Sequence, residues 1–168
     1  MNFISTSIIL LCIFTTSCFA QYNRKDWKHW NGGVREAVFK EEKIDSFWIC
    51  MYTGDTVYNS KFLDIDHVIP LKEAYLSGAE SWSKTKKELY ANYLRNPNHL
   101  VAVTASSNRS KGSKDPSKWM PKINKDAYIK TWIEIKKEWN LSFDEVEEAF
   151  ILNFIKRSNK PSEYFNYK

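Results

Sequence analysis

Residues 63–71, LDIDHVIPL, place two carboxylates and one of only three histidines inside an apolar run that is otherwise typical of a buried strand. Asp64, Asp66 and His67 resist burial unless they are paired or bound to another group. A neutral histidine near pH 7 can take a proton from water, and carboxylate oxygens are ligands for hard cations such as Mg²⁺. The segment therefore indicates acid–base and metal-assisted chemistry. The alternative is that His67 is a hydrogen-bonded core residue and Asp66 belongs to an ion pair.

Two more polar clusters lie further along the chain. Asn98 and His99 directly precede a second apolar stretch. The third cluster is the basic segment SSNRSKGSKDP (106–116), which carries Asn108, Arg109, Lys111 and Lys114. A run of basic residues is usually a solvated face, so this segment has a structural explanation as well as a functional one.

Taken together, the clusters meet the demands of phosphodiester hydrolysis. That reaction needs a base for water, a divalent cation for the charge that develops on phosphorus and the leaving oxygen, and cations for the polyanionic backbone. His67 supplies the base, and Asp66 and Asn108 supply oxygen ligands for Mg²⁺, with Mn²⁺ as the alternative. Because neighbouring residues of a strand point to opposite faces, Asp66 and His67 can serve one phosphate only if the chain bends near Pro70. The predicted phosphate contacts are Arg109, Lys111 and Lys114.

A small set of elements must position these residues. Strands are expected over 61–71 and 100–103. A short helix is expected over 104–111, with Thr104 as its N-cap and Gly112 as its C-terminal stop. The order strand, insertion, strand, short helix predicts an α+β protein with its chemistry beside the small β portion.

Helices account for most of the remaining pattern. The insertion between the strands, residues 73–94, is rich in helix formers and is interrupted at Ser77-Gly78. A capping box of Ser142 and Glu145 predicts the start of a C-terminal helix. Further helices are expected in four places: 34–43, from Asp115-Pro116 onward, 125–139 and 143–157.

The motifs resemble those of HNH endonucleases, the ββα-metal or His-Me finger, and more narrowly those of secreted HNH nucleases related to the C-terminal domain of GmrSD-type restriction enzymes. The resemblance implies a ββα-metal finger core surrounded by several α-helices. It also implies a metal-dependent endonuclease acting on DNA, with RNA as the alternative substrate. The matching segments are LDIDHVIPLKEAYLSGA (63–79), YANYLRNPNHLVAV (90–103) and NRSKGSKDPSKWMP (108–121), with weaker echoes in YNRKDW (22–27), VRE (34–36) and YTG (52–54).

Carried over by position, the resemblance implies roles for five residues. His67 is the general base, and Asp66 and Asn108 hold the metal. Asn98 falls where the family has a middle asparagine that braces the loop and helps to orient the histidine. Asp64 matches an acidic position of secondary importance.

The sequence departs from the family pattern in two places. Tyr93 stands where relatives usually have an aspartate, which puts one local contact beside the site in doubt. The paired cysteines that are common in secreted relatives are missing. Cys50 is the one cysteine after residue 20, so we expect the domain to be held by its core.

The first twenty residues predict export. They contain no charged side chain, and their apolar stretch, residues 8–14, is too short to span a bilayer and leads to CFA, a small-x-small exit. We therefore expect 1–20 to be a signal peptide and 21–168 to be one HNH nuclease domain, secreted or periplasmic and without stable membrane insertion. A lipoprotein anchored through Cys18 is the alternative, although Thr15 stands where a lipidation site normally has an aliphatic residue.

The charge balance points to an anionic partner. The formal net charge is +5 and the isoelectric point is about 9.0, which suits nucleic acid but also other anionic surfaces. Asp66, His67 and Asn108 together favour a nuclease over the alternative, a non-catalytic basic nucleic-acid-binding or envelope protein with the same fold. A chain of this length has no separate module for reading sequence, so we expect low sequence specificity. We also expect a monomer.

Overall fold

The structure, a computed structural model, describes residues 21–27, 31–158 and 164. In that part of the chain it contains α-helices, short 3₁₀-helices and four short strands, and it confirms the predicted α+β class. In chain order the elements are η1 (Arg24–Asp26), α1 (Val34–Glu41), β1 (Trp48–Ile49), β2 (Thr56–Val57), η2 (Ser60–Phe62), β3 (Leu63–His67), α2 (Leu71–Leu76), η3 (Ala79–Ser81), α3 (Lys84–Ala91), β4 (Leu100–Thr104), α4 (Ala105–Lys111), α5 (Lys125–Trp139) and α6 (Glu145–Arg157).

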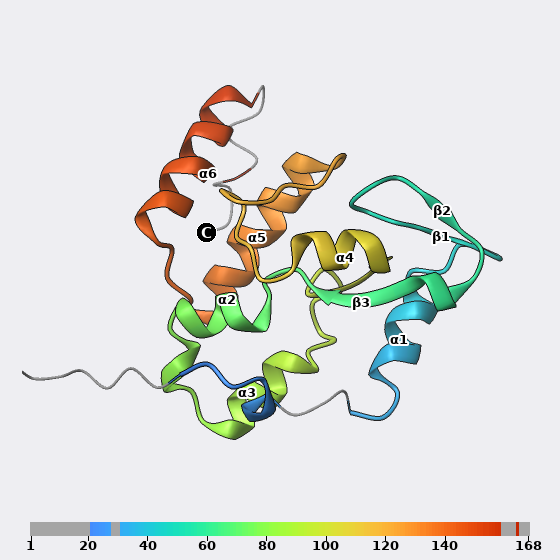
Figure 1. Ribbon diagram of the computed structural model, residues 1–168, viewed down its shortest axis with the longest axis horizontal. Coiled ribbons are helices and arrows are strands. Elements are labelled where there is room, and N and C mark those ends of the chain that lie inside the picture. Colours follow the sequence, from blue (N-terminus) through green and yellow to red (C-terminus); the bar gives the residue numbers. More distant parts are fainter. Residues whose placement is uncertain (1–20, 28–30, 159–163, 165–168) are drawn as a thin grey trace, which may run out of the picture.

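A ββα unit of β3, β4 and α4 lies at the centre of the molecule (Figure 1). β3 and β4 pair antiparallel in the register Asp64↔Val103 and Asp66↔Val101. α4 follows β4 without a loop because Thr104 ends the strand and also caps the helix, its side chain accepting the N–H of Ser107. The predicted order of strand, insertion, strand and short helix is therefore confirmed.

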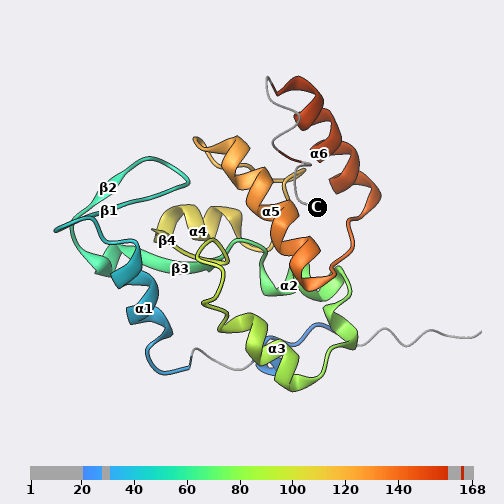
Figure 2. The same cartoon turned by 180° about the vertical axis from the view of Figure 1, so that it is seen from behind.

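The two faces of this hairpin serve two hydrophobic cores. Leu100 and Ala102 of β4 pack with α1 and β1, whereas the alternate residues Val101 and Val103 face the larger core of helices. α1 and the β1–β2 pair lie at one end of the molecule and α6 at the other (Figures 1 and 2). The hairpin thus joins both cores, and its acidic residues share the face of Val101 and Val103.

A buried charge cluster ties the C-terminal helices to the insertion. Lys136 of α5 is fully buried, and its Nζ donates to Glu73 of α2 (3.0 Å) and to Glu147 of α6 (2.6 Å). The same ammonium donates to Ser77 Oγ (3.0 Å), and Glu147 also accepts the indole N–H of Trp132. Three helices therefore meet at one cation.

The single cysteine of the described chain is structural in position. Cys50 is a buried free thiol, with its Sγ 3.8 Å from Thr104 Oγ1 and 3.7 Å from Ser107 Oγ. These two residues begin α4, so the thiol packs under the start of that helix. The fold of the described residues contains no disulfide.

Local sequence signals were wrong at two helix starts, and the strand expected over 61–71 is confined to Leu63–His67, because residues 60–62 form η2 and α2 begins at Leu71. No helix opens at Asp115, because its side chain accepts the backbone N–H of Ser117 (2.9 Å) and holds a turn instead. α6 is capped by Asp144 with Glu147 and not by Ser142 with Glu145. The interruption expected at Ser77-Gly78 is confirmed: Gly78 has a φ of 119°, a left-handed conformation that a side chain would strain. Within the described ranges, no helix has the length and apolar character needed to cross a membrane.

Candidate active site

An open pocket of about 480 Å³ lies where β3 ends. It is lined by Asp66, His67 and Asn108, three residues that the sequence analysis placed in one site. β3 stops at His67, and the chain bends through residues 68–69 before α2 begins, so two neighbouring residues of a strand reach the same hollow. The other lining residues are Tyr22, Arg24, Ile65, Pro70, Leu71, Lys72 and Ser113.

Asp66 is held by one of its two oxygens. Oδ2 accepts the phenol O–H of Tyr52 (2.7 Å) and the ammonium of Lys111 (2.8 Å). No described residue donates a hydrogen bond to Oδ1, so that oxygen is the one left to bind another group. Burial raises the pKa of the Asp66 carboxyl, while the Lys111 ammonium and the Tyr52 hydroxyl oppose the rise by stabilising the charged form.

Asn108 is oriented by Asp64. The amide nitrogen Nδ2 of Asn108 donates to Asp64 Oδ2 at 3.1 Å, so the carbonyl oxygen of the amide remains an acceptor. Asp64 and Asp66 lie on one face of β3 because they are two residues apart, and α4 brings Asn108 over that face. Asp64 thus contacts a residue that lines the pocket without lining the pocket itself.

His67 has a defined tautomer. Its Nε2 lies 3.0 Å from the carbonyl oxygen of Ala91, which can only accept, so Nε2 carries the proton and Nδ1 is the basic nitrogen. The ring stacks parallel to Tyr90 and meets the edge of His99 at 6.0 Å between centroids. Burial, together with the nearby His99, Arg24 and Lys111, holds the pKa of His67 well below its usual range. The imidazole is therefore neutral at pH 7.

The donor set of the pocket suits Mg²⁺ or Mn²⁺. Oδ1 of Asp66 and the amide oxygen of Asn108 are hard oxygen ligands in one hollow. In the described part of the chain, no group of three or more His, Cys, Asp and Glu side chains is placed to hold a metal ion. Mg²⁺ usually takes one or two carboxylates and completes its shell with waters and substrate phosphates, so two protein oxygens are an adequate set.

The three predicted phosphate contacts lie in two different settings. Lys111 is completely buried, donating to Asp66 and to the carbonyl oxygen of His67 (2.9 Å), so its position does not support a phosphate contact. One helical turn separates it from Asn108, which puts both on the inner side of α4. Arg109 and Lys114 are exposed, and neither is among the residues that line the pocket.

Asn98 lies away from the pocket. It is exposed in the turn before β4, and its backbone N–H donates to Asn96 Oδ1 at 3.0 Å. It lines a second hollow of about 560 Å³, between that turn and α1. The imidazole of His67 contacts Ala91, Tyr90 and His99. This geometry does not support the predicted role of Asn98 in orienting the histidine.

Sequence reasoning missed three residues around the pocket. Tyr52 donates to Asp66, and Arg24 and Lys72 line the hollow with exposed side chains. The weak echoes YNRKDW and YTG contain Arg24 and Tyr52, but nothing in either motif indicates contact with β3. Lys72 lies in the first turn of α2, shortly after the bend at 68–69. Its closeness in sequence to Asp66 and His67 was the one available signal.

The fold is an α+β domain built on a ββα unit, with an open pocket at the end of β3. The chain belongs to the family described as GmrSD restriction endonucleases, C-terminal domain, which matches residues 19–153. It is also similar to a protein of Arthroderma benhamiae that is named as an uncharacterized secreted protein, with 31% identity over 152 residues, covering 80% of this chain and 74% of that protein. No solved structure matches the chain.

Proposed function

We propose that the protein is an exported HNH endonuclease that hydrolyses phosphodiester bonds of DNA with low sequence specificity and requires Mg²⁺ or Mn²⁺. The observation that carries the proposal is the meeting of Asp66, His67 and Asn108 in one open pocket. Membership of a restriction-endonuclease family supports a nucleic-acid substrate. RNA is the alternative substrate, because the chemistry does not use a 2′-hydroxyl.

In the proposed mechanism, His67 is the general base. Its Nδ1 takes the proton of the attacking water, and the carbonyl of Ala91 stabilises the imidazolium by keeping its hydrogen bond to Nε2. Asp66 and Asn108 would hold the divalent cation, which when bound stabilises negative charge on the phosphate and the leaving oxygen. The water oxygen bonds to phosphorus, the bond between phosphorus and the 3′ oxygen breaks, and the 3′ oxygen takes a proton from solvent, which leaves 5′-phosphate and 3′-hydroxyl ends.

Plasmid cleavage by purified residues 21–168 tests the proposal. We expect supercoiled DNA to be nicked or linearised with Mg²⁺ or Mn²⁺ and to remain intact with EDTA. His67→Ala should lower the rate by at least about 100-fold, since a positioned general base contributes that much. His99→Asn is the matched control: it removes a buried imidazole from the same ring cluster, but His99 does not line the pocket.

Circular dichroism establishes that each variant is folded before the rates are compared. Cleavage that survives in His67→Ala, or that falls equally in His99→Asn, would contradict the assignment of the base. If the wild type retains DNA without cutting it, the protein is instead a basic nucleic-acid-binding protein. The ion pair between Asp66 and Lys111 favours this second candidate, because the carboxylate already has a partner.

We also propose that residues 1–20 are a secretory signal and that the mature protein is secreted or periplasmic. Those residues lie outside the described part of the chain. The name of the Arthroderma benhamiae relative supports export. Mass spectrometry of the protein recovered from its native compartment tests the proposal. An N-terminus near Gln21 is expected, whereas a lipid-modified Cys18 would indicate an anchored lipoprotein.

A further inference from the structure

Part of the pocket wall comes from outside the ββα unit. Tyr22 and Arg24 belong to the N-terminal segment that contains η1, and Lys72 stands in the first turn of α2. In sequence the two cations are 48 positions apart, yet they line the same hollow as Asp66 and His67.

The N-terminal segment is fixed to the helices by aromatic contacts on both sides of Arg24. Trp27 is buried, with its ring 5.6 Å from Tyr90 between centroids, and Tyr22 meets the edge of Tyr75 at 5.5 Å. The guanidinium of Arg24 donates from Nη1 to the carbonyl oxygen of Trp27 at 3.0 Å. These contacts hold the side chain of Arg24 at the pocket and limit the entropy that it would lose on binding a ligand.

The buried and the exposed residues of the pocket differ in chemistry. Asp66 and His67 are buried at its floor, whereas Arg24 and Lys72 are exposed at its rim. A cation at the rim can meet an anion that stays partly in solvent, while the floor takes the reacting group. A guanidinium beside an ammonium suits phosphate oxygens, because the guanidinium can donate two parallel hydrogen bonds and the ammonium adds a point charge.

We propose that Arg24 and Lys72 form a binding site for the backbone phosphate next to the one that reacts. The inference rests on the proposed nuclease function and names the residues that hold its substrate. It replaces the predicted contact from Lys111, whose ammonium is buried against Asp66. The nucleic-acid backbone is thereby bound by the N-terminal segment and α2 rather than by the basic segment that contains α4.

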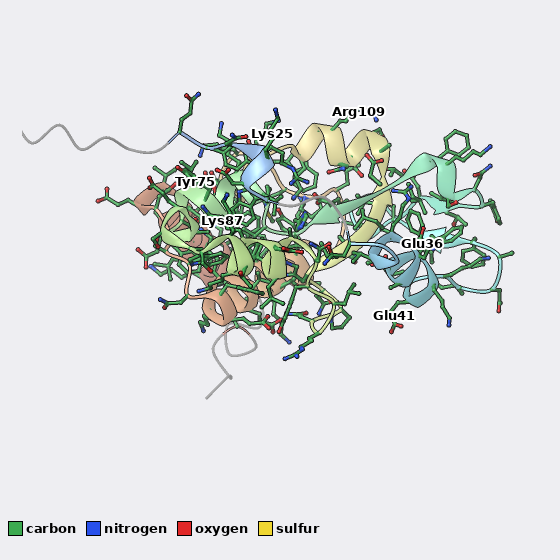
Figure 3. The ribbon with its side chains drawn as sticks, turned by 90° about the horizontal axis from the view of Figure 1, so that it is seen from below. Lys25, Glu36, Glu41, Tyr75, Lys87 and Arg109 are labelled. Atoms are coloured by element: carbon green, nitrogen blue, oxygen red, sulfur yellow. The ribbon has the colours of Figure 1, made fainter. Side chains whose placement is uncertain are left out.

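The matched control is Lys25, which stands beside Arg24 in η1 and is exposed without lining the pocket. Figure 3 shows Lys25 on η1 and Arg109 on α4 on the same side of the molecule, away from Glu36 and Glu41 of α1. Lys25→Ala therefore removes a charge next to Arg24 in the chain without removing a residue that lines the pocket. Arg24→Lys keeps the charge and removes the fork.

The experiment measures fluorescence anisotropy of a labelled 20-base-pair duplex with the purified mature protein in EDTA, over a series of salt concentrations. Each phosphate contact contributes about 0.9 to the slope of log K against log salt. We expect Arg24→Ala and Lys72→Ala each to weaken binding by about tenfold and to reduce the slope by about one. Arg24→Lys should keep the slope and lose part of the affinity, and Lys25→Ala should change neither.

Equal losses of DNA affinity in Lys25→Ala and Arg24→Ala would overturn the proposal, because the effect would then be the general electrostatic attraction of DNA to a positively charged protein. Unchanged binding in both Arg24→Ala and Lys72→Ala would overturn it as well. Because binding is measured without metal, the result is separate from catalysis. A protein that binds as expected but never cuts plasmid would refute the nuclease and leave the phosphate site standing, while cutting with an unaltered slope would do the reverse.

Discussion

Tyr52 and Lys111 hold the same oxygen of Asp66, and this arrangement decides how that carboxylate can act. With Oδ2 occupied by two donors, a cation would meet Asp66 through Oδ1 alone. The Lys111 ammonium also cancels one of the two negative charges that Asp64 and Asp66 bring to this face of β3. If a divalent cation binds as proposed, we expect weak binding to the free protein and tighter binding once a phosphate completes the cation's shell.

Tyr52→Phe tests the importance of that hold on Asp66. The variant removes only the O–H that lies 2.7 Å from Oδ2. We expect Mn²⁺ binding, measured by electron paramagnetic resonance without DNA, to weaken by about tenfold, because partners that orient a ligand contribute that much to metal affinity. The matched control is Tyr90→Phe, which removes an equally buried O–H that donates to the carbonyl oxygen of Ile69 at 2.9 Å.

Both variants should lose about 1 kcal/mol of unfolding free energy, the usual contribution of one buried hydrogen bond. A loss of Mn²⁺ affinity that is the same in the two variants would attribute the effect to general destabilisation. Unaltered Mn²⁺ binding in Tyr52→Phe would remove Tyr52 from the site.

At the scale of elements, α1 closes the open edge of the hairpin with a carboxylate. Glu42, the residue after α1, accepts the backbone N–H of Ala102 in β4 with both oxygens, at 3.1 and 3.0 Å. Burial raises the pKa of Glu42 from 4.5 to about 7, and the hydrogen bond from Ala102 offsets part of the rise. The folded protein therefore binds a proton at Glu42 more tightly than the unfolded chain does.

This shift predicts a stability that falls as the pH rises. Below pH 4.5 Glu42 is protonated in both states, and between 4.5 and about 7 only the folded state keeps the proton, so stability is lost across that window. Glu42→Gln, whose amide oxygen can still accept from Ala102, should be more stable than the wild type at pH 8, by about 1–2 kcal/mol after allowance for partial exposure. The two proteins should unfold alike near pH 4.

Urea unfolding at the two pH values measures this effect, with Glu41→Gln as the control. Glu41 is the exposed neighbour that lines the same second hollow. If Glu41→Gln gives the same gain at pH 8, the effect comes from net charge rather than from the buried carboxylate. A Glu42→Gln variant that is less stable at pH 8 would contradict the shifted pKa.

The elements were predictable where local chemistry decides them. Thr104 and Gly112 bound α4 as their cap and stop signals indicated, and the two apolar stretches located both strands of the β3–β4 pair. Asp115 defeated the local signal, because an aspartate before a proline suits a turn as well as a helix, and its contacts with Ser117 select the turn. Propensity alone cannot choose between two structures that use the same side chain.

The candidate site was predictable for the residues that neighbour each other in the ββα unit and for no others. Asp66, His67 and Asn108 converge because β3 pairs with β4 and α4 follows β4 directly. Lys111 was misplaced because a lysine in a basic segment is usually solvated, although its spacing from Asn108 already put both on one face of the helix. Arg24 arrives by a long-range contact, which leaves no pattern in a single sequence.

At the scale of the whole molecule, Lys136 holds the C-terminal helices to the rest. Lys136→Met should lower the unfolding free energy by about 3–5 kcal/mol, because Glu73 and Glu147 would remain buried without their cation. Urea unfolding of Lys136→Met and of Lys137→Met, its exposed neighbour, measures the difference. Equal stability of the two variants would mean that the ion cluster contributes nothing beyond the packing of its side chains.

Cys50 is the one thiol between residues 21 and 168, and it lies buried and unbonded to any other sulfur. The domain therefore needs no oxidant to reach its folded state. It can therefore fold in a reducing cytosol as readily as in an oxidising compartment outside the cell. If the protein is exported and cuts DNA as proposed, a copy retained in the cytosol would be folded and active beside the chromosome of the producing cell. Synthesis of such a protein calls for rapid export or for an immunity factor.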